Sequence, residues 1–235
     1  MRGTVEGCSM AERDEHRRIL DLLTSLDAAL LRQSECWFAG GTAISLRCDE
    51  FRISRDVDFL CASREGYRQL RQRVYEAGVR GLFVADMAVR RELRADRYGI
   101  RVVLDVGGAP IKLEIVSEGR IELAGVEDPE LPVARLADED LVAEKLLANE
   151  DRFLDDAALA RDVIDLILLE HVLGGLPQAA WDKARGAYGP SVEDAWSRAL
   201  RRLCDQPGWR ARALEALCVT PEARAVVEAR VERER

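Results

Sequence analysis

A pair of glycines directly after a short apolar run constrains the fold of this chain more than any other feature. The run Cys36–Ala39 has the length and aromatic content of a strand. Gly40-Gly41 ends it, and Thr42 can cap a helix over 42–48. A second apolar run, 56–61, has the pattern of another strand. A strand, a glycine turn, a helix and a second strand predict a sheet with helices packed on it.

The second predicted strand carries two acids, Asp56 and Asp58, separated by one residue. Side chains at i and i+2 project from the same face of a strand, so both carboxylates can point at one divalent cation. Glycines let backbone N–H groups approach a phosphate closely. Glu114 is the best candidate for a third acid, because it alternates with the apolar Leu113 and Ile115 in a later strand. Carboxylate-held metal ions neutralise the charge that develops in phosphoryl transfer, so these parts predict a site for a metal-bound nucleoside triphosphate.

The rest of the first half mixes helical and strand patterns. We expect helices over 11–33 and 64–77, the second ending at Gly78. Strands are expected over 82–84, 100–106 and 111–116, with a hairpin between the last two. This order predicts an α/β or α+β sheet domain over residues 1–126.

From Pro129 and Pro132 onward the sequence shows only helical patterns. We expect helices over 138–150, 156–173, 177–187, 191–205, 208–217 and 221–234. Ser191 with Asp194 resembles a capping box, and Thr220 before a proline is a typical helix N-cap. The sequence therefore predicts an all-helical second domain over 127–235.

Composition disfavours several classes of function. The formal net charge of −8 argues against a protein that coats nucleic acid non-specifically, although residues 64–101 hold ten arginines and five acids. With only His16 and His171, neither a His-rich zinc site nor His-based catalysis is expected. No apolar run approaches the roughly 18–20 residues that span a bilayer, and the N-terminus lacks a signal-peptide core. The six cysteines form no C-x-x-C pair, which indicates a reduced, cytoplasmic protein.

Five motifs occur in a characteristic order: FAGGTAISLR (38–47), SRDVDF (54–59), IKLEIV (111–116), EKLLA (144–148) and RDVIDL (161–166). Together they resemble the nucleotidyltransferase AbiEii/AbiGii toxin family of the DNA polymerase β-like nucleotidyltransferase superfamily, to which the MenT-type toxins are related. The resemblance spans roughly residues 36–170. It implies a polymerase β-like mixed sheet domain followed by an all-helical domain.

The resemblance also implies roles for individual residues. The nucleotide would be bound by Gly40, Gly41, Thr42, Ser54 and Lys145. The metal, Mg²⁺ or Mn²⁺, would be held by Asp56, Asp58 and Glu114. The catalytic residues would be Asp56, Asp58, Glu114, Lys145 and Asp162. Glu114 would act as a metal ligand or as the base for the incoming hydroxyl. Asp162 would orient Lys145, and Asp165 is the alternative for that acid.

The leading hypothesis is a magnesium-dependent nucleotidyltransferase that moves an NMP group from an NTP to an acceptor hydroxyl. The resemblance implies the toxin of a toxin–antitoxin or phage-defence pair, with tRNA or another RNA as acceptor, a cognate antitoxin as partner and no membrane association. One alternative is the same chemistry on a cationic small molecule such as an aminoglycoside antibiotic, which the acidic charge suits. The other is a non-catalytic binding module of this fold, against which the retained acids count.

Overall fold

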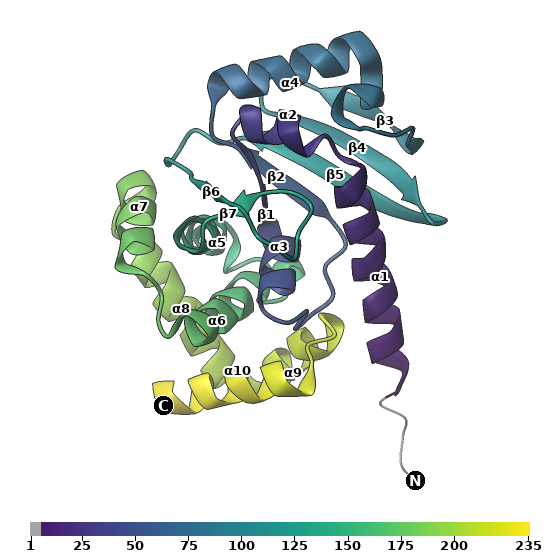
Figure 1. Ribbon diagram of the computed structural model, residues 1–235. Helices are drawn as coiled ribbons and strands as arrows, with labels where there is room; N and C mark the ends of the chain where they lie inside the picture. Colours follow the sequence, from purple (N-terminus) through teal and green to yellow (C-terminus); the bar gives the residue numbers. More distant parts are fainter. Residues whose placement is uncertain (1–5) are drawn as a thin grey trace. The chain divides into compact units, whose positions relative to one another are not determined.

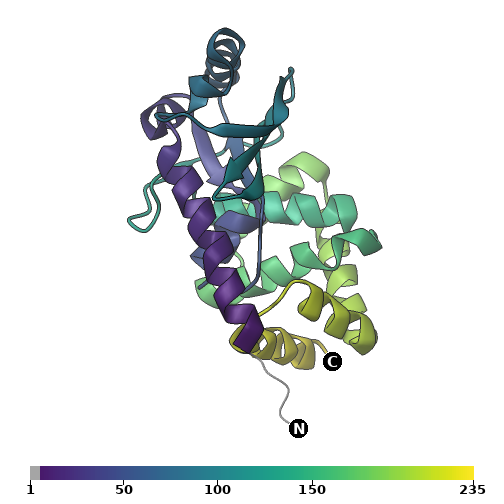
Figure 2. The same ribbon diagram turned by 90° about the vertical axis from the view of Figure 1, so that its right-hand side faces the viewer.

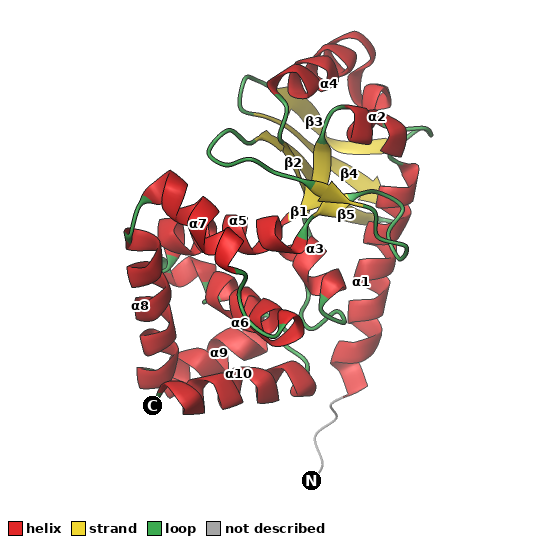
Figure 3. Ribbon diagram, turned by 60° about the vertical axis from the view of Figure 1, so that its left-hand side comes forward, coloured by secondary structure: helices red, strands yellow, loops and turns green. Residues whose placement is uncertain are grey.

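The computed structural model describes residues 6–235, with the backbone alone for residues 6–13. The chain forms two compact units. The first comprises the chain up to Ala43 together with Ser54–Ala137, and the second comprises Ile44–Ile53 and Asp138–Arg235. All the strands that the structure describes, yellow in Figure 3, belong to the first unit. The fold is therefore a mixed α/β sheet unit followed along the chain by helices, as the sequence predicts.

The first unit is built on a seven-stranded sheet with the order β3-β4-β5-β2-β1-β7-β6 (Figure 1). Its strands are β1 (Cys36–Ala39), β2 (Val57–Cys61), β3 (Ala88–Ala95), β4 (Gly99–Val106), β5 (Ala109–Ser117), β6 (Gly125–Val126) and β7 (Arg135–Leu136). The central strand β2 pairs antiparallel with β1 and parallel with β5. Adjacent β4 and β5 form the predicted hairpin.

One face of this sheet forms the core of the first unit. Alternate side chains such as Phe59 and Leu113 are buried on it. Helices α1 (Glu6–Ser25), α2 (Ala28–Gln33) and α4 (Arg64–Ala77) pack against its strands (Figure 2). Because side chains alternate along a strand, the remaining residues of β2, β4 and β5 project from the other face.

The expected single helix over 11–33 is wrong, because the chain turns at Asp27. The Asp27 carboxylate accepts a hydrogen bond from the backbone N–H of Leu30 (3.0 Å) and so begins a separate helix, α2. The expected cap at Thr42 is also wrong, since α3 (Gly40–Arg47) already begins at Gly40. Helix α4 has the predicted bounds and ends at Gly78, with φ +60°.

No strand forms over 82–84. That segment follows a 3-10 turn, η1 (Gly78–Leu82), and Phe83 makes an isolated bridge to Leu26. Besides the two-residue strands β6 and β7, sequence reasoning missed β3, at the edge of the sheet. Nearly all of its side chains are exposed on both faces, so its sequence carries no hydrophobic alternation.

The second unit is helical in all its described elements. They are the end of α3, α5 (Asp138–Arg152), η2 (Asp156–Ala158), α6 (Arg161–Leu173), α7 (Gln178–Tyr188), α8 (Ser191–Asp205), α9 (Pro207–Ala216) and α10 (Pro221–Glu234). Helix α5 packs against α6, α7 and α8. Helix α6 is buried on nearly all sides from Asp162 to Leu169, which explains its apolar sequence.

The division between the units differs from the predicted boundary at 126/127. Short strands β6 and β7 extend the sheet through the proline-containing segment, and Arg135 pairs with Phe38 of β1. Sheet structure therefore continues to Ala137. Residues 44–53 join the helical unit because their backbone bonds to the α9–α10 connection, for example from the Ile53 N–H to the Leu217 carbonyl (3.1 Å).

The two predicted caps of the second unit have different outcomes. Thr220 caps α10, since its hydroxyl accepts a hydrogen bond from the Ala223 N–H (3.3 Å). Ser191 forms no capping box, because α8 begins after Pro190 and the Ser191 hydroxyl donates to the Tyr188 carbonyl (3.1 Å).

The described cysteines, Cys36, Cys48, Cys61, Cys204 and Cys218, are free thiols. Residues 1–5, on which the expectation about a signal peptide rests, and the side chain of Cys8 lie outside the described residues. Across the described helices, the structure shows no apolar stretch long enough to cross a bilayer.

Candidate active site

The site begins where β1 passes into α3. Gly40 has φ +74°, a left-handed conformation that glycine adopts without strain. A Cβ atom at this position would lie 2.5 Å from Oδ2 of Asp58, so only glycine allows the carboxylate this close to the backbone. The first N–H groups of a helix have no partner within it and attract anions. The junction therefore places backbone donors of α3 beside an acid.

Asp56 and Asp58 lie on the face of the sheet opposite to the core face of the first unit. Val57 and Phe59, which alternate with them, are completely buried on the core face. Asp58 is half-buried within β2, and Asp56 is exposed just before the strand begins. The two carboxylates therefore share a face, as the spacing predicts.

Two hydroxyls fix the loop that carries Asp56. The buried Thr42 hydroxyl donates to the backbone carbonyl of Asp56 (2.5 Å) and lies 2.8 Å from the Ser54 hydroxyl. These contacts connect the first turn of α3 to the segment before β2. The side chains of Thr42 and Ser54 thus hold Asp56 in place, and their predicted nucleotide contacts stay a prediction.

Glu114 lies beside Asp58, because the two residues are paired in the parallel β2–β5 ladder. Its carboxylate accepts hydrogen bonds from Arg101 Nε (2.5 Å) and from the ammonium of Lys112. Burial alone would raise the pKa of Glu114, but the bonds from Lys112 and Arg101 outweigh it and lower the pKa. Glu114 is therefore ionised at neutral pH, which suits a metal ligand better than a general base.

The donor set fits a hard divalent cation. Asp56 and Asp58 supply carboxylate oxygens of the kind that Mg²⁺ prefers, with substrate phosphates and water completing its coordination. Glu114 would join them by releasing one of its two cations. In the part of the chain whose side chains are described, no three acid, imidazole or thiol groups lie close enough to form a ready metal cluster.

The second unit contains a buried charge network around Lys145. The Lys145 ammonium lies 3.1 Å from Asp162 Oδ1 and 3.0 Å from Asp165 Oδ2. Arg52 donates two hydrogen bonds to the carboxylate of Asp165 (2.6 and 2.9 Å), and Arg152 donates two to the carboxylate of Asp162 (2.9 and 2.8 Å). Both acids that sequence reasoning proposed as alternatives therefore contact the lysine.

The neighbours of Lys145 and Asp162 favour the charged form of both groups. Burial alone would lower the pKa of Lys145, but Asp165 and Asp162 outweigh it and raise the pKa. Burial would likewise raise the pKa of Asp162, whereas Lys145 and Arg152 lower it well below its ordinary value. Sequence reasoning missed Arg52 and Arg152, because nothing in their local sequence marks them as partners of residues so far along the chain.

The acidic segment between α5 and α6 does not displace Lys145 from Asp162. It forms the turn η2 and then two consecutive left-handed residues, Leu159 (φ 48°) and Ala160 (φ 56°), before α6 begins. The candidate site residues are divided between the two units: the acids of β2 and β5 belong to the first unit, and the Lys145 network belongs to the second.

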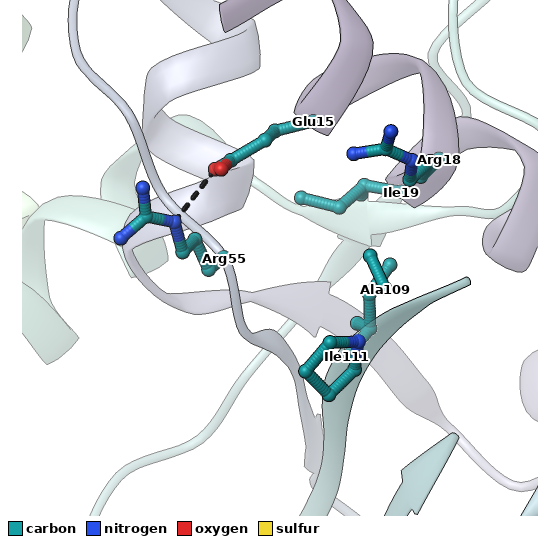
Figure 4. Close-up of a pocket in the computed structure, with 7 residues that line it drawn as sticks. Glu15, Arg18, Ile19, Arg55, Ala109 and Ile111 are labelled. Carbon is teal, nitrogen blue, oxygen red and sulfur yellow. Dashed lines mark hydrogen bonds and ion pairs between the residues drawn. The ribbon is translucent and has the colours of Figure 1, made fainter. Parts of the chain in front are cut away.

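A separate pocket of about 190 Å³ lies on the core face of the sheet in the first unit. Figure 4 shows Arg55 and Arg18 at its sides, with Arg55 bonded to Glu15 of α1 (2.7 Å). Its apolar wall includes Ile111, which shares the parity of the buried residues of β5. The pocket is therefore on the face opposite to Glu114.

Comparison with solved structures gives matches at low sequence identity. JHP933 from Helicobacter pylori is 14% identical, with a TM-score of 0.50, and the match covers 95% of this chain and 91% of that one. An antigenic nucleotidyltransferase-like protein from Paracoccidioides brasiliensis is 17% identical over 78% of this chain and 92% of its own, with a TM-score of 0.45. The nucleotidyltransferase toxin MenT4 from Mycobacterium tuberculosis is 19% identical over 92% of both chains, with a TM-score of 0.33. The likeness to JHP933 shows the fold alone.

No curated protein sequence matches this chain. A protein family does match, over residues 21–216, and it is described as the nucleotidyl transferase AbiEii toxin of type IV toxin–antitoxin systems. The matched region contains the glycine pair, the three acids and the Lys145 network, and it continues past residue 170, where recognisable motifs end. Because the match covers most of the sequence, the chain belongs to the AbiEii nucleotidyltransferase toxin family.

Proposed function

We propose that this protein transfers an NMP group from a metal-bound NTP to an acceptor hydroxyl, as the toxin of a toxin–antitoxin pair. The observation that carries the proposal is the junction of β1 and α3. At this junction Gly40 lets the backbone at the start of α3 come close to Asp58, because a side chain there would clash with the carboxylate. Asp58 is in turn paired with Glu114 of β5. A triphosphate needs backbone donors and a carboxylate-held cation within one small space.

In this mechanism the N–H groups at the start of α3 bind phosphate oxygens. Asp56 and Asp58 would hold Mg²⁺ or Mn²⁺, which would neutralise the negative charge on the oxygens of the transferring phosphoryl group. Thr42 keeps Asp56 in position through its backbone carbonyl. Glu114 acts as an ionised ligand at the same face, and its low pKa makes it a poor acceptor for the proton of the incoming hydroxyl.

Lys145 has a narrower role in this proposal than the sequence implied. An ammonium group has three N–H donors, and Asp162 and Asp165 occupy two of them in the described structure. One donor is left for a phosphate oxygen. Asp162 and Asp165 therefore orient the ammonium and keep it charged, and Arg52 and Arg152 hold those acids in turn.

Incubation of the protein with radiolabelled NTPs, Mg²⁺ and total RNA tests the proposal. We expect labelled RNA from the wild type and none from Asp56→Ala/Asp58→Ala. Asp86→Ala is the matched control, because Asp86 is an exposed acid of the same unit whose ion-pair partner among the described side chains is a surface arginine, Arg80. Absence of transfer to any RNA by the wild type would refute an RNA acceptor.

Expression in a bacterial host separates the leading function from its alternative. We expect growth arrest that the cognate antitoxin relieves and that the double Asp variant does not cause. Resistance to aminoglycosides without arrest would instead indicate a small-molecule acceptor, which the net charge of −8 suits.

A further inference from the structure

One row of paired residues crosses the polar face of the sheet, from the site acids to the edge strand. Asp58 is paired with Glu114 across β2 and β5. Glu114 is paired with Arg101 on β4, and Arg101 is paired with Arg94 on β3. Residues opposite each other on adjacent strands project from the same face. Since strands lie about 4.8 Å apart, the row extends about 14 Å from Asp58 to Arg94.

A second row lies two residues along β4 and β5 and contains Lys112, Val103 and Arg91. In a regular strand Arg91 and Arg94 would project from opposite faces, because they are three residues apart. Register shifts in β3 on both sides of Arg91 pair it with Val103 and pair Arg94 with Arg101. The irregular strand therefore turns both arginines to the face that carries the acids, as bulges beside active sites do.

These rows contain four cations that we call the basic strip: Arg91, Arg94, Arg101 and Lys112. They line a groove of about 280 Å³ together with Glu92, Val102 and Val103. Its lining thus combines four cations with two valines and one acid. It continues directly to the candidate active site, because Arg101 and Lys112 both contact Glu114.

Arg91 and Arg94, the two cations of the basic strip farthest from the acids, have no ion-pair partner among the described side chains. Both are exposed. Their neighbour Arg90 differs, because it pairs with Asp105 at 2.7 Å. In a chain of net charge −8, two uncompensated arginines beside the site form a local surface for an anionic partner.

We propose that the basic strip binds the phosphodiester backbone of the acceptor RNA and leads its reactive end towards Asp58. This inference rests on the proposed function and adds the surface that holds the acceptor. The strip gives charge without base-specific donors in a fixed pattern, so it positions a strand and does not read its sequence. Arg91 and Arg94 contact the backbone away from the acids, and Arg101 and Lys112 contact it next to Glu114.

Affinity for a short fluorescein-labelled single-stranded RNA, measured by anisotropy over a range of NaCl concentrations, tests the strip. In Arg91→Ala/Arg94→Ala we expect weaker binding and a smaller salt dependence. The slope of log Kd against log salt should fall by about 0.7 for each lost phosphate contact, or about 1.4 for both. Arg90→Ala is the matched control on the same strand, and its slope should stay close to that of the wild type. Thermal unfolding confirms that the variants are folded.

Four other results would overturn the inference. An unchanged slope in the double variant, or an equal loss in Arg90→Ala, would show that the strip does not contact RNA. Weaker binding of Mg²⁺–NTP by the double variant, measured by calorimetry, would show that the arginines hold the triphosphate instead. Displacement of the RNA by polyglutamate as readily as by polyuridylate would indicate an acidic protein partner.

The calorimetric measurement also separates this inference from the proposed function. If the wild type binds RNA through the strip but does not bind Mg²⁺–NTP, the proposed transfer fails while the strip remains a nucleic-acid site. If it binds Mg²⁺–NTP and the RNA affinity does not depend on Arg91 or Arg94, the strip fails and the transfer stands.

Discussion

Replacing Gly40 with alanine should damage the candidate active site more than it damages the fold. At φ +74° a residue with a Cβ atom is strained by roughly 1–2 kcal/mol. The new Cβ would also lie 2.5 Å from Asp58 Oδ2. Carbon atoms normally stay about 3.5 Å or more from their neighbours, so the carboxylate must move by about 1 Å.

A displacement of that size at a reacting centre can lower the rate ~100-fold. We therefore expect Gly40→Ala to lose about 1–2 kcal/mol of unfolding free energy and ~100-fold in nucleotidyl transfer. For a chain of this size that loss of stability corresponds to a decrease in Tm of about 2–4 °C per kcal/mol. Urea titration measures the first quantity, and incorporation of labelled NMP measures the second.

Gly78→Ala is the matched control. Gly78 also has a left-handed backbone (φ +60°), but a Cβ there would have no neighbour within 4 Å. Gly78→Ala should lose stability through backbone strain alone and keep its transfer activity, because no neighbouring group has to move. Full activity in Gly40→Ala, or equal losses of activity in both variants, would refute the argument that close approach to Asp58 makes the site.

Three further predictions concern charge. Arg52→Ala leaves the buried Asp165 without its bidentate partner and should cost about 3–5 kcal/mol of unfolding free energy in urea titration. Burial would raise the pKa of Asp162, but Lys145 and Arg152 outweigh burial and lower the pKa in the folded state. The contribution of Asp162 to the free energy of unfolding is therefore complete above its ordinary pKa near 4 and is lost as the pH falls below that value. Acid unfolding should accordingly be less steep in Asp162→Asn. Lys112→Met removes a hydrogen-bond donor to Glu114, so the pKa of Glu114 should rise. The acidic limb of the pH–rate profile should then move to higher pH. An acidic limb at unchanged pH would contradict the role of Glu114 as an ionised metal ligand.

Sequence reasoning found the parts of the site that depend on local pattern. The bounds of β1 and the shared face of Asp56 and Asp58 follow from alternation along a strand, which the buried Val57 and Phe59 confirm. The glycine turn was also anticipated. The sequence does not reveal why a glycine is needed at position 40, because the approach of Gly40 to Asp58 depends on how β1 pairs with β2.

The parts that depend on distant contacts could not be predicted. Arg52 and Asp165 are far apart in the sequence, and an arginine beside a phenylalanine has no local sign of a buried ion pair. Strand β3 escaped notice for a different reason. A strand exposed on both faces needs no apolar alternation, so the pattern that reveals β2 and β5 is missing from it.

The edge position of β3 has a consequence for solubility. An edge strand leaves one row of backbone donors and acceptors unpaired, and such rows can add strands from other molecules. Charged side chains and an irregular register oppose that addition, and β3 has both. The arginines of β3 that we propose to bind RNA would thus also hinder pairing between the sheet edges of two molecules. Neutralising them should make the protein aggregate more readily at high concentration, an effect that added single-stranded RNA could no longer suppress.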